Sequence, residues 1–283
     1  MSTTSPPVPT AAHPTTVSPT TPLVTPTVTP PATPPTARPA ISPFQRQAPV
    51  LTARYRATLL GDWPTLLLLV AQAPFIGWLC TVVWSSVETD TPSLRFVLAL
   101  AAVWFGCING CREIVKERAI VERERLFGLS MAAYTWSRFA VLAWLSLAQV
   151  ILLQGAVEWH LSLHGPMGLQ ILALWGASLC GVGMGLLVSA LAKAQERAVG
   201  AIPLLLLPQI LFSEFAIPRK SFGRVVETVE YLMPVRWAYR IFEETAAKET
   251  DWWIVAGSLA VLPVYTAVLG ILVVLVLQKR REF

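Results

Sequence analysis

Charged side chains are scarce in this sequence. Asp, Glu, Lys and Arg make up 14% of the 283 residues, whereas 54% are hydrophobic, and the mean hydropathy is +0.56. A soluble globular domain carries roughly 25% charged residues, because its surface faces water. The composition therefore excludes an ordinary soluble domain and predicts an integral membrane protein.

Cysteine is scarce as well, and its spacing gives little support to a metal site. The four cysteines fall within or at the end of apolar stretches. Their one regular spacing, Cys107 with Cys111 at i and i+4, supplies two thiols, which is half of a closed zinc site. We interpret all four as small apolar residues and expect no metal. They are Cys80, Cys107, Cys111 and Cys180.

Long apolar windows, by contrast, are abundant. A helix needs roughly 20 apolar residues to cross the hydrocarbon core of a bilayer, and six windows approach or exceed that length. The fifth is short and is interrupted by Pro203 and Pro208, so we expect a broken or re-entrant end there. The sequence thus predicts an all-α protein with six transmembrane helices, over residues 63–84, 94–111, 132–157, 169–191, 199–212 and 254–277.

Basic residues are concentrated in the segments that six spans would place on one side of the membrane. Because short cytoplasmic loops carry an excess of Lys and Arg, both termini are predicted to be cytoplasmic, in a cell (inner or plasma) membrane. The net charge of +5 is then explained by topology and contact with anionic lipid, without a nucleic acid partner. The basic positions are Arg54 and Arg56; Arg112, Lys116, Arg118, Arg123 and Arg125; Lys193 and Arg197; and Lys279, Arg280 and Arg281.

The N-terminal region has two parts of different composition. Residues 1–43 contain thirteen prolines and twelve threonines, and we expect a disordered cytoplasmic tail that acts as a passive tether or as a recruiting segment. Residues 44–62 mix apolar and basic residues, which favours an amphipathic interfacial connecting helix or an ordinary juxtamembrane flank. In the helix, Arg54 and Arg56 would face headgroups, and Leu51, Tyr55, Leu59 and Leu60 would face lipid. Residues 63–283 form the predicted six-helix domain.

The densest charge lies between the second and third windows, in residues 112–125, which we call the charged segment. It has no Gly or Pro before Gly128, so we expect a stable helix with pairs of Glu113 with Lys116 and Arg118 with Glu122. A solvated extension of the second span and a contact surface for another protein explain it about equally well. Its charges are Arg112, Glu113, Lys116, Glu117, Arg118, Glu122, Arg123, Glu124 and Arg125.

The residue order in two stretches resembles the permease part of type-2 ABC exporters, the white or ABCG-like group. In that family a coupling segment between two spans contains Glu, then Glu-Arg, then Arg-Glu, a small-residue turn and an aromatic residue. The resemblance covers residues 50–283. The matching residues are Glu113, Glu117-Arg118, Arg123-Glu124-Arg125, Gly128, Ser130, Tyr134 and Ser137, followed by Ile217-Pro218, Met233-Pro234 and Arg236-Trp237-Ala238-Tyr239 in the family's external re-entrant region before the last span.

The resemblance implies a permease subunit of an ATP-driven exporter that moves an amphipathic or lipid-linked substrate by alternating access. No GxxxxGK[ST] motif occurs in the sequence, so ATP and Mg would be bound by a separate ATP-binding cassette subunit, and a second copy or a related permease would complete the pore. Glu113, Glu117, Arg118, Arg123, Glu124 and Arg125 would couple the two subunits. Phe105, Asn109, Gln209 and Phe212 would border the substrate path, although residue type and position favour hydrogen bonds between helices for Asn109 and Gln209.

Two other functions are open from the sequence. Glu158, His160 and His164 could form the centre of a membrane-embedded metal-dependent enzyme, although Gly165-Pro166 makes helical geometry doubtful there. A membrane scaffold could recruit partners through its Pro/Thr-rich tail. GxxxG spacings at Gly106 with Gly110 and Gly181 with Gly185 predict close helix packing.

Overall fold

The described part of the chain is helical. A computed structural model describes residues 42–86, 90–213, 215 and 223–279, and no strand occurs among them. Residues 1–41, with almost all of the predicted tail, lie outside the described residues, as do Ile217-Pro218, Arg280 and Arg281. The helices are α1 Pro43–Gly61, α2 Trp63–Trp84, α3 Pro92–Gly110, α4 Arg118–Leu126, α5 Met131–Glu158, α6 Met167–Leu191, α7 Gln195–Gly200, α8 Ile202–Leu211, α9 Arg224–Tyr231, α10 Pro234–Ala246 and α11 Trp252–Lys279, with a 3₁₀ turn at Val115–Glu117.

Five of these helices, α2, α3, α5, α6 and α11, are long and apolar enough to cross a membrane. Their bounds agree with five of the six predicted windows, and the chain is a multi-pass integral membrane protein. The remaining window, residues 199–212, is divided between α7 and α8, which meet at Ala201. Pro203 stands in the first turn of α8, where a missing N–H is tolerated, and Pro208 lies inside it. The predicted total of six spans is therefore not confirmed.

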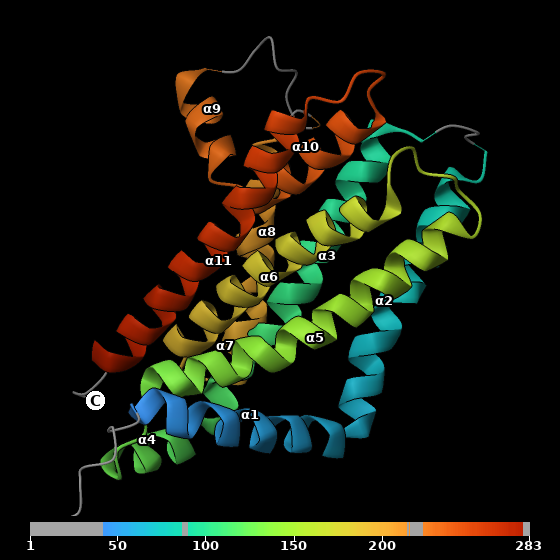
Figure 1. The fold of residues 1–283 in the computed structure, drawn as a ribbon. Helices are drawn as coiled ribbons and strands as arrows, with labels where there is room; N and C mark the ends of the chain where they lie inside the picture. Colours follow the sequence, from blue (N-terminus) through green and yellow to red (C-terminus); the bar gives the residue numbers. More distant parts are fainter. Residues whose placement is uncertain (1–41, 87–89, 214, 216–222, 280–283) are drawn as a thin grey trace, which may run out of the picture. The chain divides into compact units, whose positions relative to one another are not determined.

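Helices α1 and α4 lie at one end of the described helices, and α9 and α10 lie at the other (Figure 1). Helix α1 starts at a capped end, where the Ser42 hydroxyl accepts a bond from the backbone N–H of Gln45 at 3.3 Å. Leu51 and Tyr55 of α1 are 7% and 1% exposed. The prediction that these two side chains face lipid is wrong, because they pack with α5 in the protein interior.

The closest helix contact joins α3 and α6 through the two predicted glycine pairs. A Cβ atom at Gly110 would lie 2.7 Å from the carbonyl oxygen of Val182, and one at Gly185 would lie 2.5 Å from that of Cys107. Gly106 and Gly181 meet the backbone of the opposite helix in the same way. The absence of side chains lets the two backbones touch, as GxxxG packing requires.

The predicted external region before the last span contains α9 and α10. Helix α10 begins at Pro234 and buries one face, including Ala238, Ile241 and Phe242, against α3, α6 and α11. Gly165, in the turn before α6, adopts φ +111° and lies against Thr245 of α10. A residue with a side chain would be strained at that φ, so glycine allows the α5–α6 turn to close over α10.

Candidate functional site

The charged segment consists of two short helical pieces instead of the predicted single helix. After α3 ends, the chain turns, forms the 3₁₀ turn Val115–Glu117 and continues as α4. The backbone N–H groups of Ile114 and Val115 both donate to the hydroxyl of Ser189 in α6, each at 3.0 Å. These donors are used for a bond to another helix, so the helical ladder breaks here. The prediction of one continuous helix over residues 112–125 is wrong for this reason.

Both predicted local ion pairs within the segment are present. The Lys116 Nζ atom lies 2.6 Å from a Glu113 carboxylate oxygen, and the Arg118 Nε atom lies 2.9 Å from Glu122. The guanidinium of Arg118 also donates to the carbonyl of Ala192, just beyond α6, at 3.3 Å. The segment is therefore held to the end of α6 at two places, Ser189 and Ala192.

Glu117 pairs with Arg138, a residue of α5 that the sequence analysis missed. Arg138 is 2% exposed, and its guanidinium carbon lies 3.9 Å from the centre of the Tyr55 ring and 4.7 Å from that of Tyr134. A buried cation needs such compensation, because transfer of an unpaired charge from water is costly. An arginine inside an apolar window is the signal that could have identified it.

The side chain of Tyr55, which packs against the Arg138 guanidinium, is uncharged. Burial, and next the negative charge of Glu113, raise the pKa of its phenol well above the usual value. The phenol keeps its proton near neutral pH, so it adds no negative charge beside Glu117. Helix α1, the charged segment and α5 thus meet at one cation, Arg138.

Glu124 and Arg125 connect α4 to the first and the last described helices, α1 and α11. Glu124 accepts two bonds from the guanidinium of Arg54 in α1, at 2.6 and 3.2 Å, and this bonding raises the pKa of Arg54. Arg125 donates to the carbonyl oxygens of Leu277 and Gln278 at the end of α11, at 2.7 and 2.9 Å. The charged segment is therefore bonded to α1, α5, α6 and α11.

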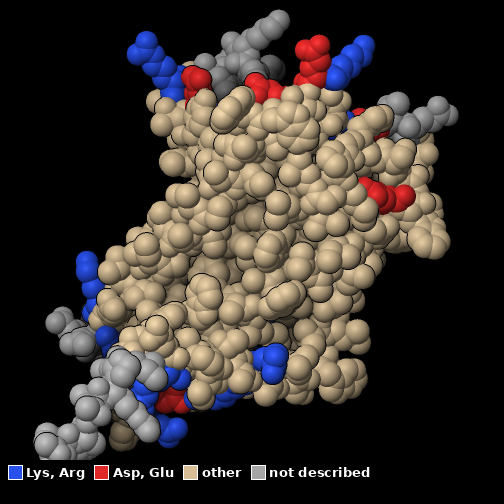
Figure 2. Space-filling model, viewed as in Figure 1, with Lys and Arg blue, Asp and Glu red and all other residues tan. Residues whose placement is uncertain are grey.

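The outer side of α4 exposes both charged and apolar side chains. Arg123 is exposed, and three apolar side chains nearby, Ile120, Leu126 and Phe127, are 44%, 85% and 86% exposed. Figure 2 shows the Lys, Arg, Asp and Glu side chains visible from this side gathered toward the two ends, with a broad uncharged band between them. The outer side of α4 thus combines charge with apolar area at one polar end, as protein-contact surfaces do.

The four predicted substrate-path residues do not meet in one cavity. Phe105 is fully buried, and Asn109 donates to Gln149 and Ser146 of α5 at 2.6 and 3.4 Å. Gln209 and Phe212 instead line a small cavity near α10, and the Gln209 side-chain oxygen accepts a bond from the backbone N–H of Val235 at 3.4 Å. Asn109 and Gln209 therefore both make the interhelical hydrogen bonds that the sequence left as an alternative.

The residues proposed for a metal enzyme are not gathered into a ligand set. Helix α5 ends at Glu158, so His160 and His164 lie in the following turn and do not share a helical face. Within residues 42–86, 90–213, 215 and 223–279, no group of three His, Cys, Asp or Glu residues could hold a metal. The scaffold alternative rests on the tail, whose residues 1–41 are outside the described part.

The chain is similar to known proteins at two levels, a whole family and a single relative. The ABC-2 type transporter family matches residues 46–245, which is most of the described chain. The chain is also 28% identical over 152 residues to the ABC transporter ATP-binding/permease protein Rv1747 of Mycobacterium tuberculosis. That alignment covers 50% of this chain and only 17% of the relative.

Proposed function

The chain belongs to the ABC-2 type transporter family, and we propose that it is a permease subunit whose charged segment receives the force of ATP hydrolysis on a separate subunit. One observation carries the proposal: the short helix α4 is bonded to both α1 and α11, and Glu117, the residue just before α4, is paired with α5. A polar segment that only solvates a turn has no need of such bonds.

We propose that ATP is bound and hydrolysed on another polypeptide. The sequence has no GxxxxGK[ST] motif, which is the backbone cradle that holds nucleotide phosphates. The mycobacterial relative is named as both an ATP-binding and a permease protein, which supports a working unit containing both functions. We propose that the two functions lie on separate subunits here, and that a second copy or a related permease completes the pore.

The proposed coupling is mechanical. Closure of the ATP-binding subunits would move α4, and the pairs from Glu117 and Glu124 would carry the motion to α5 and α1 as rigid elements. The bond from Ser189 to the segment brings α6, with its tightly packed partner α3, into the same movement. Glu113, Arg118 and Arg125 hold the segment in shape, and Arg123 faces outward to the ATP-binding subunit.

The substrate path is proposed along α3 and α8. Phe105 and Asn109 stand on α3, and Gln209 and Phe212 on or just after α8. Exposed apolar side chains on these helices, Trp104 at 39% and Leu204 at 71%, would face the second permease copy. An apolar path suits export of an amphipathic or lipid-linked molecule by alternating access. Both termini and α4 would then be cytoplasmic, in a cell membrane, in agreement with the basic residues of that end.

The first test is purification of the tagged chain from its host in mild detergent, with ATP hydrolysis in the eluate as the readout. Wild type is expected to bring ATPase activity with it. Arg123→Glu combined with Phe127→Ser should lose most of that activity, because the substitutions change the proposed docking surface. Both side chains are exposed, so the fold should be kept. Arg224→Glu, an exposed charge reversal at the opposite end, is the matched control. Equal ATPase yield from the α4 variant and the control would contradict the proposed docking site.

A further inference from the structure

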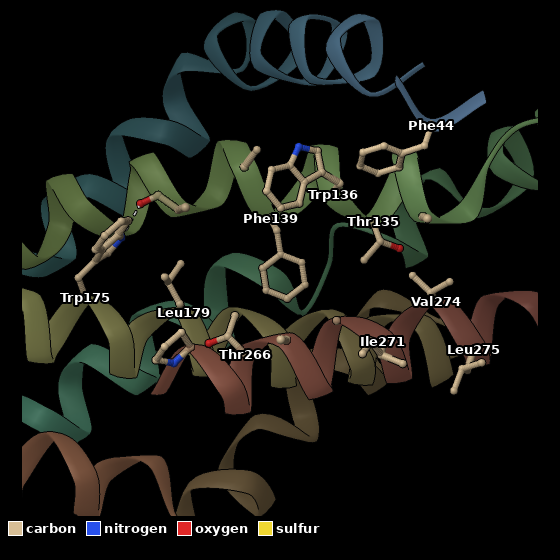
Figure 3. Close-up of a pocket in the computed structure, with 16 residues that line it drawn as sticks. Phe44, Thr135, Trp136, Phe139, Trp175, Leu179, Thr266, Ile271, Val274 and Leu275 are labelled. Carbon is tan, nitrogen blue, oxygen red and sulfur yellow. Dashed lines mark hydrogen bonds between the residues drawn. The ribbon is translucent and has the colours of Figure 1, made fainter. Parts of the chain in front are cut away.

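A second feature of the membrane-spanning helices has no part in the proposed coupling. α5, α6 and α11 enclose an open cavity of ≈ 620 Å³, which we call the lateral groove. Phe139 and Ala140 of α5, Trp175 and Leu179 of α6, and Thr266 and Gly270 of α11 line it (Figure 3). Its volume lies within the roughly 300–1,000 Å³ typical of small-molecule sites.

The lateral groove offers almost no hydrogen bonds to an occupant. The indole N–H of Trp175 donates to the backbone carbonyl of Ala143 at 2.9 Å, and the hydroxyl of Thr266 donates to the backbone carbonyl of Leu262 at 3.0 Å. The hydroxyl oxygen of Thr135 is buried. An occupant therefore gains only apolar contact, which selects hydrocarbon.

One end of the lateral groove adjoins a second, mainly apolar crevice beside α1. Phe44, Trp136 and Ala140 line both hollows, and the crevice adds Thr52 and the exposed Arg56. Among the described residues lining the two hollows, none is acidic and Arg56 alone is charged. The combined surface is a long apolar trough with a cationic end, which matches the chemistry of an anionic amphiphile.

We propose that the lateral groove and this crevice form a site for an anionic phospholipid, with one acyl chain in the groove and the headgroup at Arg56. The lipid would come from the leaflet on the side of α1, where basic segments favour anionic headgroups. It would bridge the first turn of α1 at Phe44 and the end of α11 near Leu275, two elements that α4 also connects.

A helix of a second copy is a poorer occupant. Close helix packing in a bilayer needs small residues along the contact. Small residues do line the lateral groove, but Trp136 is 56% exposed and Phe44 is 38% exposed. The centres of their two rings lie 6.4 Å apart at the end of the groove beside α1. These rings would hold a helix away, whereas a flexible acyl chain can pass between them.

The chain provides a matched pair of variants for the test. A Cβ atom at Gly270 would meet only the Phe139 ring, at 3.6 Å, so Gly270→Leu fills the groove without a backbone collision. Gly257 is on the same helix with no atom within 4 Å of such a Cβ, and Gly257→Leu is the control. Arg56→Gln removes the cation and keeps the apolar trough.

The full chain is reconstituted in phosphatidylcholine vesicles that contain a small fraction of phosphatidylglycerol carrying a photoreactive acyl chain, and labelled peptides are identified by mass spectrometry. Labelling is expected on α5 and α11 residues of the lateral groove. It should be largely lost in Gly270→Leu and retained in Gly257→Leu. In Arg56→Gln, photoreactive phosphatidylcholine should label as well as phosphatidylglycerol does.

Three results would overturn the proposal. One is uniform labelling of all lipid-facing surfaces that Gly270→Leu does not change, which means bulk lipid only. Another is equal labelling by the two headgroups in wild type. The third is protection of the groove together with a change of oligomeric state in Gly270→Leu, which assigns the groove to a second copy. Melting temperatures of the purified variants check that each has folded.

Discussion

At the scale of single residues, Arg138 is the most informative side chain. It is buried among Tyr55, Tyr134 and Glu117, and all three partners come from different elements or turns. Removing one member of a buried ion pair leaves the other charge uncompensated, which costs about 3–5 kcal/mol. Since the Glu117 side chain is 16% exposed, water can partly relieve it, and we expect the lower end of that range.

Arg138→Gln should therefore lower the free energy of unfolding in detergent by about 3 kcal/mol. Adding Glu117→Gln should restore part of the loss, because no carboxylate is then left unpaired. Glu122→Gln breaks the exposed pair with Arg118 and should cost less than about 1 kcal/mol. Thermal or denaturant unfolding of the four proteins gives the comparison. If Arg138→Gln were no more harmful than Glu122→Gln, the cluster would not stabilise this end of the protein.

The sequence could not have paired Arg138 with Glu117. Its local patterns identified the i, i+3 and i, i+4 pairs of the charged segment, and both are confirmed. The bonds that shape the segment come from farther away: Arg54 lies 70 residues from Glu124, and Ser189 lies 75 residues from Ile114. Such pairings depend on how helices pack, and spacing along one chain does not encode that.

At the scale of elements, hydrophobic length predicted α2, α3, α5, α6 and α11 almost to the residue. Each is set by the thickness of the bilayer, which is independent of the rest of the fold. The charged segment and residues 199–212 were less predictable. The first is broken by a bond to α6, and the second is short and contains Pro203 and Pro208. In the charged segment, backbone N–H donors bond to α6 and not within the helix, and at the two prolines of residues 199–212 the backbone N–H is missing.

The α3–α6 contact supplies a prediction at this scale. A Cβ atom at Gly181 would collide with the carbonyl oxygen of Val103, so Gly181→Ala must push two helices apart, at a cost of about 1–3 kcal/mol for an overpacked core. Gly155→Ala, on α5 with no neighbour within 4 Å, should be neutral or slightly stabilising, because alanine is the better helix former.

Unfolding measurements on the two alanine variants in the same detergent decide the matter. Equal stability of Gly181→Ala and Gly155→Ala would show that the α3–α6 contact is looser than the glycine pairs require. A loss confined to Gly181→Ala would confirm that the two helix backbones touch at the glycine pairs.

At the scale of the whole molecule, the face seen in Figure 2 has an uncharged band between two charged ends. The bonds between the charged segment and four other helices are concentrated at one end. The sequence correctly predicted a multi-pass integral membrane protein and its family, whereas the choice of membrane and the cytoplasmic termini stay predictions. It could not predict which helices the charged segment holds. The structure shows the bonds of the charged segment to these helices, and its coupling role and its partner are our central proposal.

The most direct measurement replaces Arg123 with a photo-crosslinking amino acid and irradiates intact membranes of the host. We predict a crosslinked product that also binds an ATP photoaffinity analogue, formed from position 123 and absent when the same crosslinker replaces Arg224. A position 123 that captures no nucleotide-binding subunit, in a protein that is inserted and folded, would contradict the claim that energy enters through α4.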